Sequence, residues 1–112
     1  FIGQRLGQKA GTLSGGEQKM LLVSRALMTD PRILLIDEIT EGLQPSMIDR
    51  LQSVFLAERQ RRGLAMLIVE QHVTFALGVA DRYAVLKLGE VVDTGPAKGP
   101  EARARVAQHL AV

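Results

Sequence analysis

The chain of 112 residues contains no cysteine, no tryptophan and few other aromatic side chains. Without cysteine there can be no disulfide and no thiolate metal site, which fits a reducing compartment. The sequence has only three phenylalanines and one tyrosine, and its 14 Lys and Arg residues are nearly balanced by 12 Asp and Glu residues. Because nucleic-acid-binding proteins more often carry a basic stripe interleaved with aromatics, we expect no nucleic-acid partner.

Two further absences concern membranes and nucleotides. The longest relevant apolar run, residues 64–69, is far shorter than the roughly 20 residues that span a bilayer. No Gly-x-x-x-x-Gly-Lys-Ser/Thr segment occurs in the chain, although such a loop supplies the amides that cradle the α- and β-phosphates of a nucleotide. The sequence also begins at Phe1 rather than at a methionine, which fits a segment from inside a longer protein.

The pattern of apolar residues predicts an α/β layered domain. Helical spacing and capping signals predict helices over residues 14–29, 45–62, 73–80 and 101–110. Short apolar runs at residues 32–37 and 64–70 predict strands of a parallel sheet that is buried on both faces. Residues 83–88 and 91–94 predict a terminal β-hairpin with its turn at Gly89-Glu90.

The first predicted helix begins in an unusual way. Ser14 and Glu17 have the spacing of a capping box, which opens a helix by satisfying two of its first amides. Yet Gly15 and Gly16 form its first turn, and glycine in a helix costs about 1 kcal/mol relative to alanine. Such a well-capped helix needs another reason for its two glycines.

Two acidic residues end the first predicted strand. In open α/β sheets ligands gather outside the carboxyl ends of the strands, which is where Asp37 and Glu38 stand. An acidic residue at this place can hold Mg²⁺, usually through water. Its neighbour points to the opposite face, so Glu38 could orient an attacking water while Asp37 serves the metal. The alternative is that both acids simply begin a polar loop.

The sequence Leu-Ser-Gly-Gly-Glu-Gln at residues 13–18, followed by a strand that ends in Asp37-Glu38, resembles the ATP-binding cassette (ABC) ATPases. In that family the first element is the signature motif and the second is the Walker B motif. The resemblance covers nearly the whole chain. It implies that residues 1–112 are the C-terminal half of a P-loop NTPase domain, with a mostly parallel sheet, flanking helices and a terminal β-hairpin. The Walker A phosphate loop and the glutamine loop would lie outside the chain.

The resemblance implies roles for the matching residues. Asp37 would hold Mg²⁺, and Glu38 would polarise the attacking water. The residues that would bind ATP are Ser14, Gly15, Gly16 and Gln18 of the signature motif, with Glu41, Gly42, Leu43 and Gln44 of the loop that crosses the dimer interface. Amides at a helix N-terminus form an anion site, and glycines let a γ-phosphate approach them without a Cβ in the way.

The switch residue that contacts the γ-phosphate follows the second strand in this family. Alignment with the family strand places Gln71 there, and His72 remains the alternative through a shift of register. Ile39 stands where the family usually has proline, which removes no functional group. The arginine-rich end of the second helix, residues 59–62, and His109 are expected to be solvent-exposed.

Three short segments resemble one subgroup, the ATPase subunits of branched-chain amino acid importers: residues 41–46, 69–71 and 109–112. Gln44-Pro45-Ser46 leans towards the related urea or short-chain amide importers. This resemblance implies an ATP-hydrolysing peripheral protein at the cytoplasmic face of the inner membrane. Its partners would be a second ATPase subunit, transmembrane permease subunits and, indirectly, a substrate-binding protein. The alternatives are a catalytically inactive half-domain, as the chain alone is expected to be, and a non-transport ATPase of the same superfamily.

Overall fold

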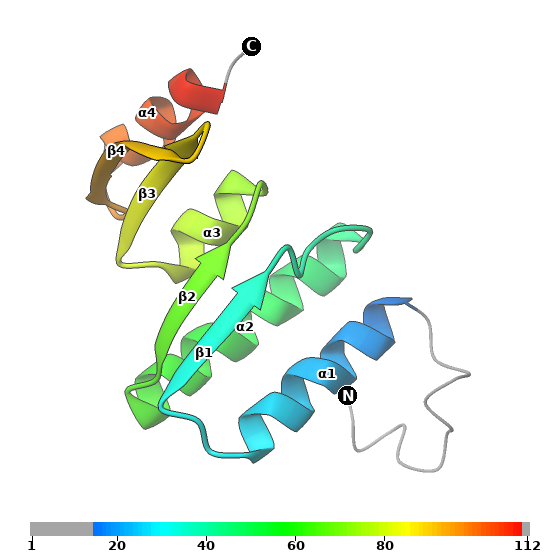
Figure 1. Cartoon of the computed structure of the whole chain (residues 1–112). Coiled ribbons are helices and arrows are strands. Elements are labelled where there is room, and N and C mark those ends of the chain that lie inside the picture. Colours follow the sequence, from blue (N-terminus) through cyan, green and yellow to red (C-terminus); the bar gives the residue numbers. More distant parts are fainter. Residues whose placement is uncertain (1–14, 111–112) are drawn as a thin grey trace.

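The structure is a computed structural model that describes residues 15–110. Figure 1 shows an alternation of helices and strands followed by a hairpin and a last helix. The elements are α1 (Gly15–Met28), β1 (Ile33–Asp37), α2 (Pro45–Arg62), β2 (Ala65–Val69), α3 (Val73–Val79), β3 (Arg82–Lys87), β4 (Glu90–Pro96) and α4 (Pro100–Leu110). The predicted α/β class and the order of its elements are confirmed, with ends that differ by one or two residues at most of them.

The strands form two separate pairs. β1 and β2 are parallel and in register from Ile33 opposite Ala65 to Asp37 opposite Val69. The connection between them is α2, which lies behind the two strands in Figure 1, while α1 runs alongside. β3 and β4 are antiparallel and form the hairpin. The carboxyl ends of β1 and β2 therefore meet at one edge, which is the edge that carries Asp37.

Local sequence explains where α2 begins and ends. Pro45 occupies the first turn, where its fixed φ suits a helix and its lack of an N–H costs nothing. Gly63 ends the helix with φ of 63°, and its N–H donates to the carbonyl of Arg59. Between these ends, Leu51 and Phe55 are fully buried. Their four-residue spacing places them on the face that the sequence pattern predicts.

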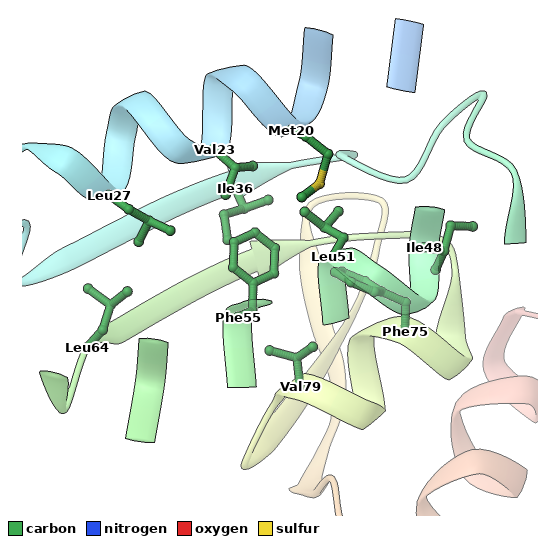
Figure 2. Close-up of a cluster of buried hydrophobic side chains, with 10 residues drawn as sticks. All are labelled: Met20, Val23, Leu27, Ile36, Ile48, Leu51, Phe55, Leu64, Phe75 and Val79. Atoms are coloured by element: carbon green, nitrogen blue, oxygen red, sulfur yellow. The ribbon is translucent and has the colours of Figure 1, made fainter. Parts of the chain in front are cut away.

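One hydrophobic core joins α1, α2, α3 and one face of the β1–β2 sheet (Figure 2). Its buried members are Met20, Val23, Leu27, Ile36, Ile48, Leu51, Phe55, Leu64, Phe75 and Val79. At its centre the rings of Phe55 and Phe75 meet edge to face, with centroids 6.1 Å apart. Burying a side chain of this size stabilises the fold by about 1.5–3 kcal/mol, so this cluster holds the sheet edge in place.

The opposite face of the parallel sheet is bare in the described part of the chain. Ile33, Leu35, Leu67 and Val69 are 61%, 70%, 62% and 54% exposed. The prediction of strands buried on both faces is therefore wrong for residues 15–110. Successive side chains alternate between the faces of a strand, and α1 and α2 pack only on the other face. We refer to these four side chains as the bare face.

The hairpin turn lies one residue earlier than predicted. Leu88 and Gly89 form it with φ of 50° and 79°, and Glu90 pairs with Lys87 across the strands. Positive φ at both central residues is the type I′ pattern, whose twist matches that of the strands. The position of this turn could not be predicted from the sequence, because leucine rarely adopts positive φ.

The arginine-rich end of α2 is less solvated than predicted. Arg59 donates to the backbone carbonyl of Val79 at the end of α3. Arg62 donates to the carbonyl of Leu27 at the end of α1, at 2.8 Å. Their side chains are only 26% and 23% exposed, so the prediction is wrong for these two, whereas Arg61 is exposed. Cations at helix C-termini satisfy carbonyls that the helix itself leaves free.

Asp93 connects the hairpin to α4. Its carboxylate lies 2.5 Å from the Arg105 guanidinium and 3.3 Å from His109 Nε2. The prediction that His109 is simply exposed is therefore wrong, because its side chain is half-buried and lies beside Asp93. The Tyr83 hydroxyl donates to the same carboxylate. Burial raises the pKa of Tyr83 above its ordinary value, and the negative charge of Asp93 adds to the rise.

Candidate nucleotide-binding and catalytic site

An open pocket lies at the carboxyl ends of β1 and β2. Its volume is about 250 Å³, and its lining residues are Glu38, Thr40, Glu41, Glu70 and Gln71. The two predicted catalytic residues, Glu38 and Gln71, thus come from different loops into one pocket. Small-molecule sites usually measure roughly 300–1,000 Å³, so the described residues form only part of a site for a nucleotide.

The backbone of Glu38 has an unusual conformation. Its φ is 49°, in the left-handed region that non-glycine residues rarely adopt. Its N–H donates to the carbonyl of Val69 at 2.8 Å, which continues the ladder between the strands by one more bond. Strained residues of this kind cluster at active sites, where the surrounding structure holds them. The conformation turns the chain out of β1 directly after Asp37.

Asp37 is not among the residues that line the pocket. It is exposed at the last position of β1 and, by strand alternation, shares the side of Leu35 and the bare face. Within residues 15–110 no three His, Asp or Glu side chains are grouped as an all-protein metal site. Mg²⁺ usually keeps several waters and needs one or two carboxylates together with substrate phosphates. The single exposed carboxylate of Asp37 fits that kind of binding.

Thr40 and Glu70 link the two loops of the pocket. The Thr40 N–H donates to Glu70 Oε2 at 3.1 Å, and the Thr40 hydroxyl donates to Glu70 Oε1 at 2.6 Å. Sequence reasoning assigned no role to either residue. The one available signal was position, since Glu70 follows the second apolar strand as the acidic pair follows the first.

The first turn of α1 lies against the loop that follows β1. A Cβ at Gly16 would lie 3.4 Å from side-chain atoms of Leu43 and Met47, whereas a Cβ at Gly15 would meet no atom of residues 15–110 within 4 Å. Lys19 donates to the backbone carbonyl of Glu41. Among the described residues, Gly15 therefore leaves its side of the helix end open, whereas a side chain at Gly16 would pack against Leu43 and Met47.

The remaining residues predicted to bind nucleotide lie on α1, in the loop after β1 or outside the described residues. Gln18 is exposed on α1, and Gln44 is exposed at the N-cap of α2 without a side-chain capping bond. Gly42 has φ of 76°, which explains a glycine there. Ser14 lies outside the described residues.

The predicted residues thus form two groups rather than one. Glu38, Glu41 and Gln71 line the pocket at the strand ends. Gly15 and Gly16, at the start of α1, are not among the residues that line it. The loop of residues 38–44 runs from one group to the other, and Leu43 touches the α1 end.

His72 has a structural task in this arrangement. It is the N-cap of α3, and its Nδ1 accepts a hydrogen bond from the Phe75 N–H at 3.1 Å. A capping side chain satisfies one of the free amides of the helix and is thereby fixed in direction. Gln71, one residue earlier, is among the residues that line the pocket, and His72 is not.

Comparison with known proteins agrees with the motifs. A family model described as "ABC transporter" matches residues 1–41. Over 96 residues the chain is 45% identical to the high-affinity branched-chain amino acid transport ATP-binding protein BraG of Pseudomonas aeruginosa, covering 84% of this chain and 41% of BraG. The chain therefore resembles ATP-binding proteins of ABC transporters. It is also 39% identical over 97 residues to the phosphate import ATP-binding protein PstB of Pyrobaculum aerophilum, covering 87% of this chain and 38% of PstB.

Solved structures of ABC cassettes share the fold. The ADP conformation of MJ1267, an ATP-binding cassette of an ABC transporter, aligns with a TM-score of 0.77 at 29% identity, covering 92% of this chain and 39% of MJ1267. A nucleotide-free cassette aligns with a TM-score of 0.78 at 29% identity, covering 90% of this chain and 39% of the other. The predicted resemblance to the ABC ATPases is confirmed, and the fold is that of part of a P-loop NTPase.

The chain spans about two fifths of the length of the curated relatives that it matches. The residues matched by the family model include β1, Asp37 and Glu38. Among the helices of residues 15–110, none has the length and apolar character needed to cross a membrane.

Proposed function

We propose that the chain is the C-terminal half of an ATP-hydrolysing subunit of an ABC importer. The observation that supports this most directly is the pocket in which Glu38, from the loop after β1, meets Gln71, from the loop after β2. Two polar side chains from adjacent strand ends are what a water-activating residue and a γ-phosphate sensor require. The 45% identity to BraG supports the same function.

Each side chain has a defined part in the proposed reaction, which transfers the γ-phosphoryl group of ATP to water. Glu38 orients the attacking water and accepts its proton. Gln71 donates a hydrogen bond from its NH2 group towards the γ-phosphate, and this neutral amide does not take up a proton in doing so. Asp37 would hold Mg²⁺, which supplies charge neutralisation of the phosphates when bound. Positioning and charge stabilisation provide most of the catalysis in such reactions.

The separation of the two groups of residues supports a head-to-tail dimer. Gly15 and Gly16 open the N-terminus of α1, where free amides favour an anion. Since they are not among the residues lining the Glu38 pocket, we propose that they, with Ser14 and Gln18, cap the γ-phosphate held by a second subunit. Residues 41–44 would then lie at the interface between subunits, as the loop that joins both groups.

The finer assignment of substrate and partners rests on relatives. BraG is named for branched-chain amino acids and PstB for phosphate, and another relative is a methionine import protein. We propose an amino acid importer of the branched-chain group, with urea or short-chain amides as the nearest alternative. Its partners would be transmembrane permease subunits and, indirectly, a substrate-binding protein, with the ATPase at the cytoplasmic face of the inner membrane. A neighbouring permease gene would support this assignment, and its absence would favour a non-transport ATPase.

The test of the proposed activity is Glu38→Gln in the full-length protein. Glutamine keeps the size and one hydrogen-bond acceptor, but it cannot take up the proton of the attacking water. We expect ATP binding to be retained and phosphate release to fall at least about 100-fold, with nucleotide trapped in dimers. Glu90→Gln on the exposed start of β4 is the matched control and should keep full activity. Loss of ATP binding in Glu38→Gln would contradict the division of labour between Asp37 and Glu38.

A further inference from the structure

The bond between Thr40 and Glu70 is unlike the other contacts of the pocket. Thr40 is buried, with 7% of its surface exposed, although it belongs to a polar loop. Both carboxylate oxygens of Glu70 are taken up by this one residue, one by its N–H and the other by its hydroxyl. The hydroxyl distance of 2.6 Å is that of a charge-assisted bond, for which about 2.5–2.7 Å is typical.

This bond completes a pair of anchors around Glu38. On the N-terminal side, the Glu38 N–H donates to the carbonyl of Val69, the last residue of β2. Two residues later, Thr40 donates two hydrogen bonds to Glu70, the first residue after β2, and we call this pair of bonds the clamp. Between the anchors, Ile39 packs against the core. The left-handed backbone of Glu38 is therefore held against the same strand end from both sides.

We propose that Glu70 is a positioning residue that sets the distance between the Glu38 carboxylate and the Gln71 amide. Glu70 precedes Gln71 directly, so one carboxylate connects the loop of the water-activating residue to the loop of the phosphate sensor. Each of its two oxygens accepts a hydrogen bond from Thr40, so the proposed action of Glu70 runs through that residue. The inference rests on the proposed ATP hydrolysis and adds to it a residue that holds the machinery in place.

The first test compares kcat and KM for ATP in the full-length protein. Glu70→Ala removes both bonds and should lower kcat about 10- to 100-fold, because a misplacement of about 1 Å can cost 100-fold. KM should stay within about twofold, since no contact to nucleotide is removed. Glu90→Ala makes the same change on exposed β4 and should leave both constants unchanged. A residue that only stabilised the fold would not split kcat from KM.

Conservative variants separate the hydrogen bonds from the fold. Thr40→Ser keeps the hydroxyl and should retain the wild-type kcat, whereas Thr40→Val loses one bond and should lower kcat. Glu70→Gln can still accept from the Thr40 N–H, but its NH2 group would have to donate to the Thr40 hydroxyl, so its kcat should fall between those of wild type and Glu70→Ala. The double variant Glu70→Ala/Thr40→Val should be no slower than Glu70→Ala alone, because two residues that act through each other are not additive. Additive losses would overturn the clamp.

A second readout does not depend on hydrolysis. Hydrogen exchange of the Thr40 amide should be at least about tenfold faster in Glu70→Ala than in wild type, because an amide freed from its acceptor opens to water. Unchanged exchange overturns the clamp. Unchanged kcat in Glu70→Ala, beside a strong loss in Glu38→Gln, overturns the positioning role alone. Equal hydrolysis by wild type and Glu38→Gln overturns the proposed function instead, and the exchange measurement still decides whether the clamp exists.

Discussion

At the scale of single residues, Glu38 joins a reactive side chain to a backbone that glutamate rarely adopts. Its φ of 49° costs on the order of 1–3 kcal/mol, and the strain persists because the carbonyl of Val69 and the clamp at Thr40 hold the chain on either side. Asp30 also has positive φ, but Asp tolerates the left-handed region better. The strain at Glu38 is therefore consistent with the catalytic role proposed for it.

The glycines of α1 can be separated by one pair of variants. A Cβ at Gly15 meets no atom of the described residues within 4 Å, so Gly15→Ala should raise helix stability by up to about 1 kcal/mol. It should nevertheless lower ATPase activity of the full-length protein, because the methyl group would cover amides that meet the partner's γ-phosphate. Gly16→Ala should act in the same sense, with its Cβ in contact with Leu43 and Met47. Melting temperature and phosphate release are the measurements.

The control for the glycine variants is Ser24→Ala, which improves helix propensity in the middle of α1 without touching its N-terminus. It should raise the melting temperature and leave activity intact. If Gly15→Ala behaves like Ser24→Ala, the open end of the helix has no part in binding phosphate.

The ion pairs of Glu58 give a pH-dependent prediction. The hydrogen bond from Arg61, together with the charges of Arg61 and Arg62, lowers the pKa of Glu58 below its ordinary value of 4.5. A carboxylate with a lowered pKa in the folded state stabilises the fold above the unfolded value and loses this contribution as the pH falls through the folded value. Glu58→Gln should therefore reduce stability by about 0.5 kcal/mol at pH 7, the usual size for exposed pairs.

Denaturant unfolding at pH 7, and again at successive values below pH 4.5, measures the Glu58 effect. The difference between wild type and Glu58→Gln should shrink as the pH falls. In an Arg61→Gln background the same substitution should cost less, because the two residues share the interaction. A difference that stays constant down to the lowest pH would show that the effect is not electrostatic.

The sequence predicted individual site residues where the local pattern alone decides their place. Glu38 and Gln71 each follow an apolar strand, and because parallel strands end at one edge they come into one pocket. The partnership of Thr40 and Glu70 could not be predicted, because it depends on the path of the loop after Glu38. The sequence left His72 as an alternative switch residue and gave no sign of its capping bond to the Phe75 amide.

At the scale of elements, helices and strands followed from periodicity and from their end signals. Pro45 and Gly63 marked both ends of α2 because their backbone preferences leave little choice. The hairpin turn was predicted one residue late, because Leu88 takes the position where asparagine or glycine is expected. A pattern of polar and apolar residues does not predict where a residue adopts a backbone conformation that its type disfavours.

The same conflict at Leu88 predicts a stabilising substitution. Leu88 has φ of 50° and a fully exposed side chain, so it contributes strain and no packing. Leu88→Asn creates the Asn-Gly pair that suits a type I′ turn and should stabilise the hairpin by about 1 kcal/mol. Leu86→Asn, the matched control within β3, should destabilise it, because asparagine is disfavoured in strands. Thermal unfolding of both variants is the measurement; a loss of stability in Leu88→Asn would contradict the turn assignment.

At the scale of the whole molecule, the unexpected feature is the bare face. The continuous apolar runs of β1 and β2 are typical of strands covered on both sides, and they were predicted so, but α1 and α2 cover only one side. The sequence pattern describes the environment for which a strand is suited, which can include parts beyond the chain that carries it. Asp37 ends the same side of β1, so whatever covers the bare face also borders the proposed magnesium ligand.

The bare face predicts how the 112-residue chain behaves by itself. Four apolar side chains that are each more than half exposed form a contiguous surface on two paired strands, and surfaces of this kind lead to association. We expect the isolated chain to self-associate at micromolar concentration, as measured by sedimentation velocity over a concentration series. Leu35 and Leu67 face each other at the centre of this surface. Leu35→Lys combined with Leu67→Glu should keep the chain monomeric without changing its net charge.

The hairpin supplies a matched control for this double substitution. Leu86 and Val91 are also cross-strand partners and are 64% and 59% exposed, so Leu86→Lys combined with Val91→Glu makes the same chemical change on the other sheet. If the bare face drives association, this control should still self-associate, and far-UV circular dichroism should show both variants folded. A monomeric hairpin variant, together with a Leu35/Leu67 variant that still associates, would show that the surface responsible for self-association lies on β3 and β4. In that case the exposed side of β1 and β2 would remain in contact with solvent without causing association, and its apolar character would need a different explanation.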